Sequence, residues 1–145
     1  MIDAEDLVIR KTVHVGAPPE EAFDVFTRGL ADWWPVATHS IGGGAVAGDW
    51  RVGGLVTETV DGEVHEWADV LEYDPPRGLL LRWRVTPGHP PTELRLRFVA
   101  DRDGTRVELT HAGWEAFPDG GLESYAGYTS GWDRVLAHYT ERAQG

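Results

Sequence analysis

Apolar and polar residues alternate in the first stretch of the chain, residues 7–15. The apolar positions there are Leu7, Ile9, Val13 and Val15. A period of two residues is typical of a strand with one buried face. Lys11 interrupts the apolar set, as charged residues often do on strands at the edge of a sheet. We therefore expect an edge strand here.

The spacing changes to that of a helix in residues 119–144. Large apolar side chains recur there every three or four residues, at Leu122, Tyr125, Tyr128, Trp132, Val135, Leu136 and Tyr139. This pattern predicts one long amphipathic helix with a broad buried face. Asp119 is suited to cap its first turn, and about 22 helical residues would span about 33 Å. Gly127 and Gly131 each cost about 1 kcal/mol relative to alanine, so the helix needs a surface to pack against.

Two shorter helical segments follow the first strand. Pro19 and the acidic residues after it suit a helix N-terminus, Phe23 and Phe26 share its inner face, and Gly29 suits its end. Residues 31–35 predict one more helical turn, ended by a proline. Residues 36–48 predict a glycine-rich loop, which lacks the lysine and the spacing of a phosphate-binding loop.

Strand and turn signals fill residues 49–112. Asp61–Gly62 is a favoured two-residue hairpin loop, and its register pairs Glu58 with His65 and Val56 with Trp67. All four residues are then expected on one face of the sheet.

A second hairpin is predicted around Asp103–Gly104. Its register would pair Phe98 with Leu109 and Leu96 with His111, which brings the apolar halves of two strands to one face.

The order of elements predicts the fold class. A strand, one or two short helices, about six strands in hairpin connection and a long helix indicate an α+β fold. We expect a curved antiparallel sheet of six to seven strands wrapped around the C-terminal helix, as in helix-grip folds. The length of 145 residues suits a single domain, 1–145.

The composition of the chain limits the classes of partner that we expect. The formal net charge is −11, so nucleic acid and anionic membranes are not expected to bind. No signal peptide or apolar span is evident and cysteine is absent, so we expect a cytoplasmic protein without disulfides. No histidine and acid spacing matches a metal site, and no cofactor is indicated.

Several short motifs together resemble the START-like (SRPBCC) superfamily. They are Ala17–Phe23, Trp33–Pro35, Asp74–Arg77, Trp83, Gly104–Leu109, His111–Trp114 and Trp132. Within the superfamily, the chain is similar to bacterial proteins that resemble the C-terminal domain of the heat-shock protein ATPase activator. The resemblance implies the helix-grip fold with a cavity between the long helix and the sheet. The superfamily includes lipid carriers, polyketide cyclases and aromatases, hormone receptors and co-chaperone domains, so it implies no single function.

The candidate ligand site is rich in aromatic residues. Trp67, Trp83 and Trp132, with Tyr125 and Tyr128, are expected between helix and sheet, where they form either a solid core or the wall of a pocket. The full set of candidate ligand-binding residues is Trp33, Trp34, Glu58, His65, Trp67, Trp83, His111, Tyr125, Tyr128 and Trp132. His111 is interpreted as a hydrogen-bonded residue of the core or pocket rim, and His39 as a solvated loop residue.

Three functions remain open. The first is binding of a small apolar or aromatic molecule without covalent chemistry. The second is an enzyme of the cyclase, aromatase or hydrolase kind, with Glu58 and His65 as acid and base. A cross-strand ion pair on a half-solvated face is the other interpretation of these two residues, and the one that we favour.

The third function is a co-chaperone-type module that binds a chaperone. The arginines predicted on the outer face of the sheet are Arg82, Arg84, Arg95, Arg97 and Arg106. They form either a solvated face interleaved with acids or a contact surface for an acidic partner or a second copy of the chain in a homodimer.

Overall fold

The computed structural model describes residues 7–85, 88–117 and 121–144. Seven antiparallel strands form one sheet in the order β1-β7-β6-β5-β4-β3-β2. The strands are β1 (Ile9–Val15), β2 (Ala45–Gly48), β3 (Leu55–Val60), β4 (Glu63–Asp74), β5 (Gly78–Trp83), β6 (Thr92–Asp101) and β7 (Gly104–Ala112). The helices are α1 (Pro19–Phe26), α2 (Leu30–Trp33) and α3 (Leu122–Arg142), with a 3₁₀ turn, η2 (Trp114–Ala116), before α3.

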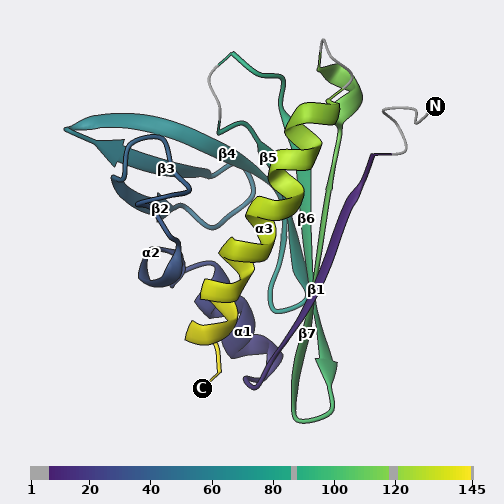
Figure 1. Ribbon diagram of the computed structural model, residues 1–145. Coiled ribbons are helices and arrows are strands. Elements are labelled where there is room, and N and C mark those ends of the chain that lie inside the picture. The colour runs from purple at the N-terminus through teal and green to yellow at the C-terminus, as the bar shows by residue number, and fades with distance from the viewer. Residues whose placement is uncertain (1–6, 86–87, 118–120, 145) are drawn as a thin grey trace.

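The long helix lies across the sheet, as Figure 1 shows, with its C-terminal end beside α1. Trp132, Val135, Leu136 and Tyr139 form its buried face. The Tyr139 hydroxyl donates a hydrogen bond to the Ala22 carbonyl of α1 at 2.8 Å, which joins the two helices. The predicted α+β helix-grip fold is confirmed.

The first hairpin has the predicted loop and one irregularity. Asp61 and Gly62 have φ of 51° and 80°, and Glu58 pairs with His65 as expected. Val56 pairs with Ala68 rather than Trp67, because the register shifts between Val56 and Thr57. Trp67 is the extra residue of this bulge, and its side chain is fully buried.

The predicted register of the second hairpin is wrong by two residues. Asp101 pairs with Gly104, so the loop is Arg102–Asp103, and Leu94 rather than Leu96 pairs with His111. Arg102 adopts the positive φ of 57° that the turn requires. Gly104 serves another purpose: a Cβ there would collide with the Val15 carbonyl oxygen of β1.

A shift of two residues leaves every side chain on its predicted face. The face assignment of β6 and β7 is therefore right, with Leu96, Phe98, Val107 and Leu109 buried.

Two boundaries differ from prediction. Residues 45–48, expected in a loop, form the edge strand β2, which pairs with β3. At the other end α3 begins after Gly121, whose φ is 80°, and Leu122 is 58% exposed instead of buried. The predicted cap Asp119 lies outside the described residues.

The outer face of the sheet carries interleaved charges. Arg84 contacts Asp69 at 2.9 Å and Glu66 at 2.7 Å, and Arg95 contacts Glu72 at 3.2 Å. Of the two alternatives for the arginines, these ion pairs favour a solvated face interleaved with acids over a contact surface of unpaired cations.

Candidate functional site

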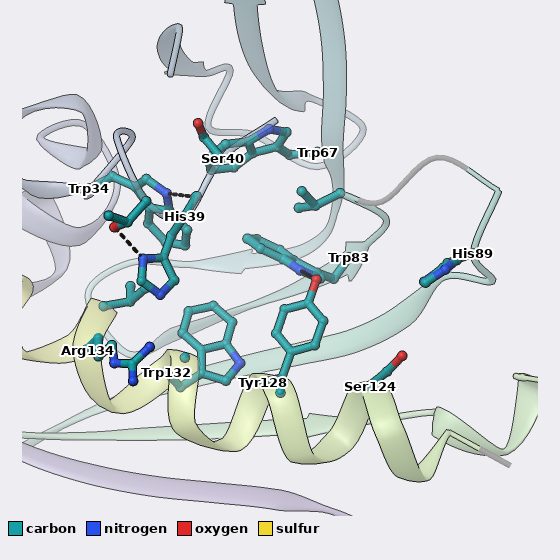
Figure 2. A pocket seen from close by; sticks show the side chains of 15 residues that line it. Trp34, His39, Ser40, Trp67, Trp83, His89, Ser124, Tyr128, Trp132 and Arg134 are labelled. Atoms are coloured by element: carbon teal, nitrogen blue, oxygen red, sulfur yellow. Dashed lines mark hydrogen bonds between the residues drawn. The ribbon is translucent and has the colours of Figure 1, made fainter. Parts of the chain in front are cut away.

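A cavity of about 390 Å³ lies between α3, the strands β4 and β5, and the loop after α2. The lining side chains come from elements far apart in the sequence (Figure 2). They are Trp34, Thr38, His39, Ser40, Trp67, Trp83, Val85, His89, Ser124, Gly127, Tyr128, Gly131, Trp132, Arg134 and Val135.

Four buried tryptophans form the inner wall. Trp34 contacts Trp67, Trp83 and Trp132 with ring centroids 5.1, 6.1 and 6.0 Å apart, and Trp83 lies 5.6 Å from Trp132. These distances are those of favourable tilted and edge-to-face pairs.

Each of these indole N–H groups already has a partner within the protein. Trp34 donates to the His39 carbonyl at 2.6 Å and Trp83 to the Tyr128 hydroxyl at 3.2 Å. Trp67 donates to Glu58 Oε1 at 3.1 Å and Trp132 to His111 Nδ1 at 3.0 Å. The tryptophans therefore offer the cavity carbon surface.

Glu58 holds the glycine-rich loop beside the cavity. Its carboxylate accepts hydrogen bonds from the backbone N–H groups of Ile41 at 2.7 Å, Gly42 at 3.1 Å and Gly44 at 2.7 Å. Burial alone would raise the pKa of Glu58, but these donors outweigh it and lower the pKa. The residue is thus a buried, ionised anchor for the loop.

The predicted Glu58–His65 acid–base pair is not assembled. The two residues face each other in the strand register, but the Glu58 oxygens are committed to the loop and to Trp67. His65 instead approaches Glu63, with Nε2 and Oε2 4.0 Å apart. A carboxylate stabilised in its charged form is also a poor general base.

His111 is a buried link behind the aromatic wall. Its Nδ1 accepts from Trp132, so the proton of the neutral ring is on Nε2, which donates to Thr92 Oγ1 at 2.7 Å. Burial lowers the pKa of His111 to about 3. The interpretation as a hydrogen-bonded core histidine agrees with this geometry.

The rim of the cavity is polar. Thr38, His39 and Ser40 come from the loop after α2, and Arg134 comes from α3. His39 Nδ1 and Thr38 Oγ1 lie 2.7 Å apart. Burial, and then the nearby charges of Arg134 and His138, lower the pKa of His39.

Two glycines of α3 lie on the cavity wall. A Cβ at Gly127 would meet nothing within 4 Å, and one at Gly131 would meet only the His39 ring, at 3.8 Å. The helix therefore presents bare backbone to the cavity at both positions.

The structure brings together half of the predicted ligand-binding residues. Trp34, Trp67, Trp83, Tyr128 and Trp132 line the cavity.

The other predicted residues lie elsewhere. Glu58 and His111 stand behind the wall and support it. Trp33 does not line the cavity; it packs on Phe26 and Tyr139 and donates to the Val25 carbonyl at 2.8 Å. Two further predicted residues do not line it: Tyr125, which packs against Trp114, and His65.

Sequence reasoning missed the polar rim. His39 was expected to be a solvated loop residue, and the helical pattern alone assigned no site role to Arg134. The one signal available was position: Arg134 follows Gly131 by three residues, so the two share a side of the helix.

The sequence matches the family described as "Activator of Hsp90 ATPase homolog 1-like protein" over residues 16–142. The chain belongs to this family. Its fold agrees with the START-like superfamily that the sequence motifs indicated.

Solved structures similar to this chain include the Aha1 dimer from Colwellia psychrerythraea. It is 19% identical with a TM-score of 0.72, over 94% of this chain and 96% of that one. CalU16 from Micromonospora echinospora is 26% identical with a TM-score of 0.62, over 90% of this chain and 71% of that one. DynU16, a protein of the dynemicin biosynthetic locus, is 19% identical with a TM-score of 0.72. The match covers 94% of this chain and 46% of DynU16. Comparison with curated proteins gives no match.

Two further observations concern residues 7–85, 88–117 and 121–144 of this family member. No three histidine, cysteine, aspartate or glutamate side chains gather there in a way that could hold a metal ion. No helix in this part of the chain is both long and apolar enough to cross a membrane.

Proposed function

We propose that the protein binds a small hydrophobic or aromatic molecule in the cavity under α3. The observation that carries the proposal is the inner wall of four tryptophans whose N–H groups all bond within the protein. Such a wall suits the flat apolar surface of a ring system. The volume of the cavity, about 390 Å³, falls in the range of small-molecule sites.

The other two candidate functions have less support. The enzyme hypothesis relied on Glu58 as a partner of His65, but the Glu58 carboxylate is engaged by the loop amides. A co-chaperone role is suggested by the family description, but the arginines Arg84 and Arg95 are paired with acids of their own sheet. The dimer formed by the Aha1 relative suggests a homodimer as a further proposal for this chain.

The neutral probe N-phenyl-1-naphthylamine tests the binding function. At 100 times its dissociation constant, a ligand that binds only the folded state stabilises it by about 2.7 kcal/mol. We expect the probe to raise the melting temperature and to quench tryptophan emission at the same concentrations.

Two serines of α3 give matched variants. Ser124 lines the cavity, whereas Ser130 is exposed on the same helix and is absent from the lining. Ser124→Phe should abolish both responses, because the phenyl ring would occupy the cavity, and Ser130→Phe should keep them. A wild-type protein that responds in neither signal, or variants that respond alike, would contradict the proposal.

A further inference from the structure

The charge of the cavity is opposite to that of the molecule. The chain has 24 acidic residues against 13 lysines and arginines, yet among the described residues no aspartate or glutamate lines the cavity. Among the described residues that line it, Arg134 carries a full positive charge, and His39 and His89 add imidazole rings. The lining is therefore cationic within an acidic protein.

Arg134 has its charge available. Within residues 7–85, 88–117 and 121–144, no carboxylate lies at ion-pair distance from its guanidinium. The neighbouring acid, Asp133, is turned to the other side of α3, where it pairs with Lys11 at 3.0 Å. Arg142 lies two turns further along α3 and approaches the Asp32 carboxylate at 3.6 Å. This arginine of the helix therefore has an acidic partner among the described residues, in contrast to Arg134.

His39 lies beside this free cation. Figure 2 shows His39 and Arg134 at one end of the cavity and Ser124 and His89 towards the other. The charges of Arg134 and His138 contribute to the lowered pKa of His39, which indicates a positive potential where its ring lies. An anion placed there would meet an arginine and an imidazole.

We propose that the cavity is selective for aromatic anions, molecules with a flat ring system that carries a carboxylate, a sulfonate or an ionised phenol. The ring would lie against Trp83 and Trp132, and the anionic group would point to Arg134 and His39. This inference rests on the proposed binding function, and it adds the chemical class of the ligand. The guanidinium suits such groups because it offers two parallel N–H donors.

Two fluorescent probes separate the inference from the function on which it rests. 1-Anilinonaphthalene-8-sulfonate differs from N-phenyl-1-naphthylamine by its sulfonate group alone. We expect the wild-type protein to bind the sulfonate about tenfold more tightly, the ratio that about 1.4 kcal/mol gives. The preference should shrink as salt rises, because an exposed arginine is screened.

Arg134→Gln should remove the preference, because it should weaken binding of the sulfonate probe far more than binding of the neutral probe. Arg97→Gln is the matched control, because Arg97 is exposed on strand β6 and does not line the cavity. This control should keep the tenfold ratio, which rules out general attraction of the sulfonate to surface cations.

The outcomes are distinct. If neither probe binds, the binding function fails and the inference fails with it. If the neutral probe binds but the sulfonate gains nothing, or if Arg134→Gln and Arg97→Gln reduce the ratio equally, the binding function stands and the anion selectivity is wrong.

Discussion

At Glu58 a carboxylate with no solvent exposure connects two parts of the site. Its oxygens accept three backbone N–H groups from residues 41–44 and the indole N–H of Trp67. A buried charge is costly unless it is fully hydrogen-bonded, and here four donors surround it. One side chain therefore fixes both the loop at the rim and a tryptophan of the inner wall.

Glu58→Gln should destabilise the protein by about 3 kcal/mol, because the neutral amide loses charge-assisted bonds and turns an NH₂ group towards N–H donors. Urea denaturation measures the loss, and amide hydrogen exchange should quicken at Ile41, Gly42 and Gly44.

Glu72→Gln is the control for this prediction. The Glu72 side chain is 58% exposed and pairs with Arg95 on the outer face, so its loss should cost at most about 1 kcal/mol. Equal losses for the two variants would show that Glu58 does not anchor the loop.

The helix α3 has different roles along its length. Its C-terminal half packs tightly, with Leu136 and Tyr139 buried, whereas its middle presents Gly127, Tyr128 and Gly131 to the cavity. Trp132 stands between the two parts and bonds to His111. The helix is thus a core element near its C-terminus and a wall of the site along its middle.

Trp132→Ala should cost about 3–5 kcal/mol of unfolding free energy, as truncation of a buried aromatic residue does. The side chain is 2% exposed and also loses its bond to His111. Leu122→Ala on the same helix is the control and should cost well under 1 kcal/mol, because Leu122 is 58% exposed. Denaturant titration decides, and a loss below 1 kcal/mol for Trp132→Ala would contradict the packing described.

Periodicity predicted the elements well and the polar parts of the site poorly. The apolar stripe of α3 and the alternation in the strands arise because one face of each element is buried. Burial of one face produces a regular spacing of apolar residues that can be read in the sequence. The bulge at Trp67 and the loop at Arg102–Asp103 depend on contacts with other strands, such as that of Gly104 with Val15. Contacts between distant strands produce no regular spacing of apolar residues, so the sequence pattern did not predict them.

The rim was hidden for a related reason. His39 lies on the loop after α2, which Glu58 holds by its amides, and Glu58 is 14 residues from the last loop amide that it binds. The aromatic wall was predictable because bulky aromatic residues must be buried somewhere. The partner of each indole N–H was not predictable from spacing alone.

At the scale of the whole molecule, the interior is solid at one end and hollow at the other. Phe23, Phe26, Phe98 and Tyr139 fill the end beside α1, with ring centroids between 5.1 and 6.0 Å apart in their described pairs. The cavity occupies the space beyond the tryptophans (Figure 2). The binding proposed above therefore uses the hollow end, whereas the end beside α1 contributes packing alone.

Acid should destabilise the whole fold through His111. Its pKa is about 3 in the folded protein and about 6.5 when unfolded, so the unfolded state binds more protons between these values. Unfolding free energy should therefore fall as pH falls, by about 2 kcal/mol between pH 7 and pH 5 from this residue. Denaturant titrations at the two pH values measure the change.

His111→Gln isolates the contribution, because its amide can accept from Trp132 and donate to Thr92. The variant should be less stable at pH 7 but should lose about 2 kcal/mol less than the wild type on acidification. An identical pH dependence would show that His111 takes up its proton without unfolding.

Gly127 and Gly131 enlarge the cavity and at the same time lower the stability of α3. Each makes the helix weaker than alanine would, by about 1 kcal/mol, and each leaves room where a methyl group would otherwise project. Any change that reinforces α3 at these two positions also adds atoms to the wall of the cavity. A substitution at either position that makes the longest helix more rigid therefore also makes the cavity smaller.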